Sequence, residues 1–167
     1  MNTIKPTNCI SSYIISSSTH LLESAASASG NRIQTIIYDK HGISTIDQKP
    51  LKLVRNTCRL HGTSLEAATE TAKLFFGSNR HKLPIAVSIE YGNPCILFPL
   101  FSPHSSANIW INLNSIINIQ EEGDETRITF TNMVEKTLPL QCKSFNQQYV
   151  RAMMYYKHIL RSRNTSL

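Results

Sequence analysis

Short runs of β-branched and aromatic residues, separated by turn residues, occupy most of this chain of 167 residues. Such runs predict strands, because branched side chains pack well on a pleated surface. We expect strands at residues 32–38, 43–47, 85–89, 95–101, 109–112, 116–120, 127–131 and 134–140. The tetrapeptide Asp39-Lys40-His41-Gly42 supplies a turn between the first two, with Gly42 suited to a positive φ. The pattern indicates a fold built around antiparallel strands.

Two helices are marked by their ends and by apolar residues at helical spacing. Thr63-Ser64-Leu65-Glu66 has the form of a capping box with Thr63 as the N-cap, and Gly77 suits the end of that helix. A second helix is predicted from Ser144, as its cap, to about Arg161. Its apolar stripe is Phe145, Tyr149, Ala152, Met153, Tyr156 and Leu160. The predicted fold class is α+β, mainly antiparallel sheet with two principal helices packed on it.

Periodicity leaves two segments open. Residues 50–60 fit either a strand or one irregular helix, since their apolar residues follow neither period cleanly. The Ser- and Ala-rich stretch that ends at Gly30 is equally ambiguous. Ahead of it, we expect a strand at residues 9–15, preceded by a loose arm at residues 1–8.

Length and composition bound the class of protein. The length fits one domain, and we expect an N-terminal arm and strand region at residues 1–30, a core at residues 31–163 as one domain or two lobes, and a short tail at residues 164–167. Apolar residues make up 41% of the chain and charged residues 17%, which is not the composition of a disordered chain. Residues 91–120 lack charge, but prolines interrupt them, so we expect no membrane span. Without a signal-peptide pattern, the expected location is the cytoplasm.

Motifs for catalysis and for metal binding do not occur. The four cysteines are scattered, without zinc spacing, so each is expected to be a small buried residue in a reducing cytosol. The sequence contains no GxGxxG, P-loop, GxSxG or HExxH motif. Ser102 and His104 are close together but lack an acidic partner to orient them. We therefore expect no enzyme, no cofactor and no metal.

The basic residues are segregated from the acidic ones. Most of the 17 Lys and Arg residues lie in residues 48–65, in residues 71–89 and after Glu135, where the chain has no Asp or Glu. The formal net charge is +6. Such runs can merge into a positive surface once the chain folds, and nucleic acid is the commonest polyanion in the cytosol. The alternative interpretation is that they are solvated faces that only favour solubility.

Two groups of cations favour nucleic-acid contacts. In residues 50–60, three cations spaced by three and four residues share one face of a helix, and two of them also share a face of a strand. Residues 79–82 place three donors side by side after a helix end, where such groups bind phosphates or enter a minor groove. The candidate DNA-contacting residues are Lys52, Arg55, Arg59, Lys73, Arg80, His81 and Lys82.

A block near the middle of the chain resembles the ComK family, the competence transcription factors of Gram-positive bacteria. It runs from Lys49 to Ser64 and reads KPLKLVRNTCRLHGTS. Further similar pieces follow in the same order at residues 81–85, 97–102, 109–111 and 128–132, and at the helix start Ser144-Phe145. The resemblance covers residues 36–160, which is most of the chain.

The resemblance implies a DNA-binding transcriptional activator of DNA-uptake genes. Members of this family recognise paired boxes of A-runs and T-runs, mainly through the minor groove, and act as dimers that assemble further on DNA. The minor groove of an A-tract is narrow and has enhanced negative potential, which attracts Arg and Lys. Arg59, His81 and Lys82 lie inside matching motifs and are carried over as DNA contacts. The other four candidates depend on charge and position alone.

The resemblance also implies partners. These are double-stranded AT-rich promoter DNA, RNA polymerase and a MecA-type degradation adaptor, and the implied location is the nucleoid within the cytoplasm. In the family, MecA uses a tail beyond the last helix, and no segment up to Leu167 resembles that tail. A second departure is Asn132-Met133, which replaces the Asn-Gly turn expected between two strands.

Two other functions stay open at this point. A basic protein-interaction or regulatory module, without specific DNA readout, would expose a large apolar patch within residues 91–120. An RNA binder would present aromatic side chains for stacking on bases. Trp110 has no aromatic neighbour in the sequence, and we expect it in the core.

Overall fold

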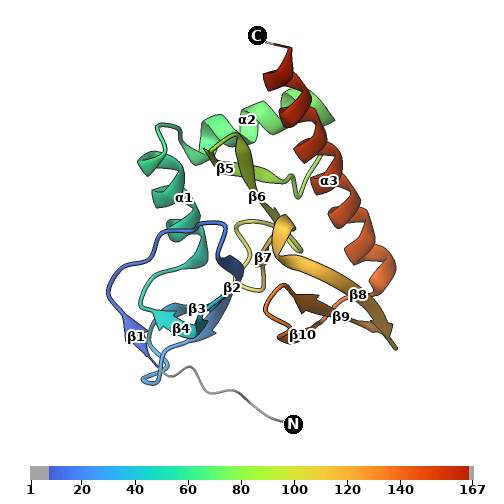
Figure 1. The fold of residues 1–167 in the computed structure, drawn as a ribbon. Helices are drawn as coiled ribbons and strands as arrows, with labels where there is room; N and C mark the ends of the chain where they lie inside the picture. The colour runs from blue at the N-terminus through green and yellow to red at the C-terminus, as the bar shows by residue number, and fades with distance from the viewer. Residues whose placement is uncertain (1–7, 166–167) are drawn as a thin grey trace.

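The computed structural model describes residues 8–165, which form an α+β structure dominated by antiparallel strands, as the sequence predicts (Figure 1). The elements of the first half of the chain are β1 (Cys9–Ile10), β2 (Thr19–Ala26), β3 (Ile33–Asp39), β4 (Gly42–Ile46), α1 (Pro50–Leu60) and α2 (Leu65–Phe76). Those of the second half are β5 (Ile85–Glu90), β6 (Asn93–Pro99), β7 (Ile109–Asn112), the 3-10 turn η1 (Leu113–Ser115), β8 (Ile116–Glu122), β9 (Glu125–Phe130), β10 (Glu135–Leu138) and α3 (Cys142–Asn164).

A seven-stranded sheet forms the centre of the fold. Its strand order is β1-β4-β3-β2-β7-β6-β5, and its neighbours are antiparallel except for the parallel pair β1 and β4. A separate three-stranded sheet has the order β10-β9-β8. The Ser- and Ala-rich stretch that periodicity left open becomes β2, which pairs with β3 on one side and with β7 on the other.

The middle strands of the large sheet are buried on both faces. Leu97 on β6 belongs to one core cluster and its neighbour Phe98 to another, because successive side chains of a strand point to opposite faces. On β7, Trp110 and Ile111 divide in the same way. A strand covered on both faces has no position for a charged side chain, which accounts for the lack of charge in β6 and β7.

The first core cluster joins α1 and α2 to one face of the large sheet. Leu53 and Val54 of α1 and Leu65 of α2 pack with Trp110 of β7, and each of these side chains is buried. Burying side chains of this size stabilises the fold by about 1.5–3 kcal/mol each. This layer fixes the positions of both helices and of the loops that follow them.

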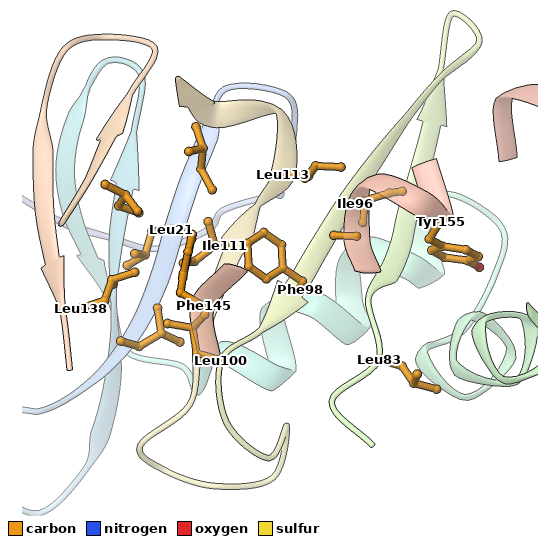
Figure 2. Packing of buried hydrophobic residues seen from close by; sticks show 14 of the residues in the cluster. Leu21, Leu83, Ile96, Phe98, Leu100, Ile111, Leu113, Leu138, Phe145 and Tyr155 are labelled. Atoms are coloured by element: carbon orange, nitrogen blue, oxygen red, sulfur yellow. The ribbon is translucent and has the colours of Figure 1, made fainter. Parts of the chain in front are cut away.

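The second core cluster joins α3 and the three-stranded sheet to the other face. Figure 2 shows part of it, with Leu21, Ile111 and Phe98 on the strands and Phe145 beside them. The rings of Phe98 and Phe145 have centroids 5.8 Å apart. In Figure 1, α3 runs along one edge of the molecule, from the three-stranded sheet at its start to α2 near its end. There Phe75 of α2 stacks on His158.

The open segment at residues 50–60 is the helix α1. Pro50 occupies the first position of the helix, where its missing N–H costs nothing and its fixed φ is helical. The buried residues Leu53, Val54, Thr57 and Cys58 form one stripe along it. The structure therefore adds a third helix to the two that the sequence marks clearly.

The predicted helix caps are wrong by one residue for α2 and by three residues for α3. Ser64, not Thr63, caps α2, because its extended backbone lets its Oγ accept a hydrogen bond from the Ala67 N–H at 3.0 Å. The helix α3 begins at Cys142 with Gln141 as its cap, three residues before the predicted cap Ser144, and the Phe145 N–H donates to the Gln141 carbonyl. No side chain caps α3.

The buried stripe of α3 is rotated from the predicted one. Its fully covered residues are Phe145, Gln148, Ala152 and Tyr155, whereas Met153, which the prediction placed on the stripe, is 37% exposed. The reason is that α3 packs against β6, β8, β9 and η1 at once, and Tyr155 also meets Phe75 and Phe76 of α2.

Two further expectations need correction and one lies outside the structure. The strand predicted at residues 9–15 is limited to Cys9–Ile10, which forms the edge strand β1 and pairs with β4. Cys58 and Cys95 are buried as expected, but Cys9 is exposed and Cys142 is half-buried. The loose arm predicted at residues 1–8 falls, except for its last residue, outside the described residues.

The prediction that Trp110 lies in the core is confirmed, because this residue is 1% exposed.

Candidate nucleic-acid interface

The helix α1 presents its cations away from the sheet. Its buried stripe faces the first core cluster, so Lys52 and Arg59 point to solvent and Arg55 lies half-buried between α1 and α2. All three residues share one face of the helix, because they are spaced by three and four positions. Residues 50–60 are a helix, so the common face predicted for these three cations is present.

A cavity of about 570 Å³ opens between α1, α2 and the two loops at residues 77–84 and 100–108. We call it the basic cavity. Five of the seven candidate residues line it: Arg55, Lys73, Arg80, His81 and Lys82. They come from three separate segments of the sequence, and the packing of both helices on the sheet brings them together. Its apolar part is made by the side chains of Leu65, Leu83, Ile85 and Trp110.

Two of the five cations are already paired with acids. Arg55 Nη2 lies 3.2 Å from Glu66 Oε1, and Lys73 Nζ lies 3.2 Å from Glu70 Oε1. Hydrogen bonding from its own backbone N–H, and then from Arg55, holds the pKa of Glu66 below its usual value. These exposed pairs contribute little to stability, and they reduce the net positive charge on the α2 side of the cavity.

The loop that follows α2 carries the uncompensated charge. No ion pair or side-chain hydrogen bond joins Arg80, His81 or Lys82 to any other residue in the part of the chain that the structure describes. All three are exposed. The loop is anchored by the buried residues Leu83 and Pro84, so its cations are held in the lining of the cavity.

Lys82 has an unusual backbone. Its φ is 55°, in the left-handed region that side chains other than glycine rarely adopt. Such a conformation costs about 1 kcal/mol or more relative to glycine. A lysine at this position therefore keeps its charge at the cost of local strain.

Two candidates lie outside the lining of the basic cavity. Lys52 and Arg59 are exposed on α1, and neither forms an ion pair among residues 8–165. Arg59 lies close enough to Glu66 to lower the pKa of that carboxyl, although more weakly than Arg55 does. Arg59 also lies in the last turn of α1, where a cation stabilises the negative end of the helix dipole.

The other wall of the cavity contains no predicted site residue. Ser102, Pro103 and His104 line it from the loop between β6 and β7. No local signal identifies these residues, because only the order of strands in the sheet brings this loop beside α1. His61 and His158 are structural neighbours: His61 ends α1 with its Nε2 3.7 Å from Glu90 Oε1, and His158 stacks on Phe75.

The structure bears on the two alternative functions. Within residues 91–120, both β6 and β7 are buried, and the large apolar side chains that remain exposed are Tyr91 and Ile117. No broad apolar patch lies there, which counts against the protein-interaction module. Trp110 cannot stack on a base, because it is covered by the core. Among the described residues, no cluster of His, Cys, Asp and Glu could hold a metal ion, and no helix could span a membrane.

Comparisons with known proteins agree with the resemblance seen in the sequence. The family model described as ComK protein matches residues 10–164. The competence transcription factor of Bacillus subtilis (strain 168) is 31% identical to this chain over 124 residues, which cover 72% of this chain and 62% of that protein. The match thus spans less than two thirds of the relative's length. No solved structure matches the chain.

Proposed function

This chain belongs to the ComK family, and we propose from that membership that it is a transcription factor that binds promoter DNA and activates competence genes. The similarity to a protein named competence transcription factor supports the biological role. The observation that carries the DNA-binding part is the loop Arg80-His81-Lys82, whose three side chains have no acidic partner among the described residues.

The arrangement of charge favours the minor groove over the major groove. A recognition helix in the major groove presents its outer face to the bases and phosphates. The outer face of α2 carries Glu66 and Glu70, which DNA phosphates would repel. Six of the seven candidate cations lie instead on α1 and on the loop after α2, and the seventh, Lys73 on α2, is paired with Glu70. A cationic loop fits the narrow minor groove of an A-tract, where the negative potential is strongest.

Paired AT-rich boxes imply more than one protein copy on the DNA. A protein that reads two equivalent boxes does so most simply as a symmetric dimer, with the spacing of the boxes set by the distance between the two reading surfaces. We therefore propose a dimer or higher oligomer as the DNA-bound form, with contacts from Lys52, Arg55, Arg59, Lys73, Arg80, His81 and Lys82. RNA polymerase and a MecA-type adaptor are further proposed partners.

Replacing the loop cations tests this assignment. Lys82→Gly removes a charge, and glycine adopts the positive φ of 55° without strain. A loss of DNA binding in this variant would therefore not be due to a destabilised fold. Arg80→Ala removes the neighbouring charge. We expect each change to weaken binding to an AT-rich duplex. Each should also reduce the slope of log K against log salt by about 0.9 for every DNA phosphate that the variant no longer neutralises.

Matched variants sharpen the result. Lys82→Arg keeps the charge and should keep most of the affinity, and Lys143→Ala removes an exposed charge from α3, on the other face of the sheet, without effect on binding. The measurement is fluorescence anisotropy with a labelled duplex at several salt concentrations. If Lys82→Gly and Arg80→Ala bind as tightly as the unmodified chain, this loop is not the contact surface.

A further inference from the structure

A second cavity, of about 250 Å³, lies beside the basic cavity. It shares Leu51, Pro103, His104 and Trp110 with the basic cavity, and much of the rest of its lining comes from the N-terminus of α1 and from the loop between β6 and β7. None of the seven candidate DNA-contacting residues lines it. Its chemistry has therefore not entered the proposed function.

The N-terminus of α1 forms one wall of this cavity through Lys49, Pro50 and Leu51. No side chain caps this helix, and its first turn contains no acidic residue. In α1, Pro50 has no N–H and the Lys52 and Leu53 N–H groups donate to the Lys49 carbonyl, so the Leu51 N–H is left without a backbone partner among the described residues. It lies at the positive end of the helix dipole. An uncapped helix start of this kind favours an anion, and phosphate is a common one.

Asn108 supplies a second and independent observation in the same cavity. Its side chain is buried, with 3% of the residue exposed, and its Oδ1 accepts a hydrogen bond from the Phe101 N–H at 3.0 Å. That bond fixes the orientation of the amide. The Nδ2 donor on the other side of the amide has no partner in the described part of the chain. A buried donor that lacks an acceptor is rare and costly, so it favours an acceptor from outside the chain, and the cavity that Asn108 lines is the space beside it.

The remaining polar residues of the lining are donors or neutral. Lys49, His104 and Ser105 offer hydrogen-bond donors, and no Asp or Glu lines the cavity. The basic cavity differs in this respect, because Glu66 and Glu70 line it. At about 250 Å³, the cavity is smaller than the pockets of roughly 300–1,000 Å³ that hold whole drug-sized molecules. Its size fits a single phosphate group.

We propose that this cavity, the α1 phosphate site, binds one phosphate group through the N-terminus of α1, the Asn108 amide and Lys49. The phosphate has two possible sources with the same chemistry: the backbone of bound DNA, or a free phosphate anion. The first source depends on the proposed function, because it places a DNA strand across the start of α1. The second does not depend on it.

The probe for this site is inorganic phosphate, added to the ¹⁵N-labelled full chain at constant ionic strength with chloride as the compensating anion. The two signals to follow by NMR are the Leu51 backbone N–H and the Asn108 side-chain amide. We expect both to shift with saturation. Asn108→Asp keeps the oxygen that accepts from Phe101 but replaces the donor by a carboxylate, so it should weaken phosphate binding by about tenfold or more. Asn118→Asp makes the same charge change at an exposed position of β8 and should have no such effect.

Titration with duplex DNA then separates the two sources. If DNA shifts the same two signals, and Asn108→Asp weakens DNA binding more than Asn118→Asp does, the site holds a backbone phosphate. If inorganic phosphate shifts the two signals and DNA does not, the site holds a free anion. The proposed function would still be tested separately, by DNA binding of the Arg80 and Lys82 variants. The proposal is overturned if neither probe shifts the two signals beyond the chloride control. The unmodified chain decides this outcome even if Asn108→Asp does not fold.

Discussion

Lys136 connects the three-stranded sheet to the large sheet, and replacing it by methionine tests how the two sheets are held together. From β10, its Nζ lies 3.0 Å from Glu23 Oε1 on β2 and donates to the Tyr38 hydroxyl on β3 at 3.1 Å. The same Nζ lies 4.9 Å from the centre of the Tyr38 ring. Tyr38 in turn donates to Glu23 at 2.9 Å.

The size of the effect follows from the burial of this group. The side chains of Lys136 and Glu23 are 22% and 18% exposed, so the pair is mostly removed from water. Removing one partner of a fully buried pair costs about 3–5 kcal/mol, because the other charge is left uncompensated. Partial access to water reduces this cost, and we expect Lys136→Met to destabilise the fold by about 2 kcal/mol. Methionine preserves most of the apolar stem, so the loss reports on the charge.

The pH range of the measurement follows from the pKa of Lys136. Burial disfavours its charged form, but hydrogen bonds and attraction from Tyr38 and Glu23 outweigh burial and raise the pKa above its usual value. A raised pKa means that the stabilisation is complete below the unfolded-state pKa of about 10.4 and is lost as the pH rises through the folded-state pKa. The effect of Lys136→Met should therefore be constant between about pH 7 and pH 9.

Urea denaturation followed by circular dichroism measures this effect. In a thermal denaturation experiment on a chain of this size, a loss of about 2 kcal/mol would lower the Tm by about 4–8 °C. Lys143→Met, which removes an exposed lysine, is the matched control and should change stability by about 0.5 kcal/mol or less. The reasoning is refuted if both variants lose the same amount, or if a double-mutant cycle of Lys136→Met with Glu23→Gln gives no coupling energy.

Two further predictions concern stability. Met133 adopts a φ of 69° in the turn between β9 and β10, so Met133→Gly should stabilise the fold by about 1 kcal/mol in urea denaturation, and a destabilised variant would contradict the geometry. His20 is buried against Phe130, and burial lowers its pKa below 6.5. Because the folded state favours the neutral ring, stability should be complete above about pH 6.5 and should fall as the pH decreases through that value. His20→Gln should lose less stability than the unmodified chain between pH 7 and pH 5, and equal losses would show that His20 does not contribute.

The strands with many branched residues could be predicted from the sequence, because their pattern is local. The segment that became β2 could not, since Ser24 and Ala25 have little preference for a strand. They are extended because β3 pairs with them along the whole strand. Similarly, the apolar residues of 50–60 follow neither the helical nor the strand period clearly. Their packing against the sheet distinguishes the helix from the strand.

The candidate site was predictable residue by residue but not as a surface. Arg80, His81 and Lys82 are neighbours in the sequence, so their grouping is local. Their position beside Arg55, and the wall made by Pro103 and His104, follow from contacts between distant segments. The pairing of Arg55 with Glu66 was not visible either, because these residues come together only when α1 and α2 fold against each other.

The most direct test of the proposed function compares two duplexes by fluorescence anisotropy at two salt concentrations. One duplex carries paired A- and T-runs at helical-turn spacing, and the other is GC-rich. We predict tight, salt-sensitive binding that prefers the A/T duplex and is displaced by a drug that occupies the minor groove. Equal and weak binding to both duplexes, abolished by salt, would contradict sequence-selective reading and would leave only nonspecific charge attraction.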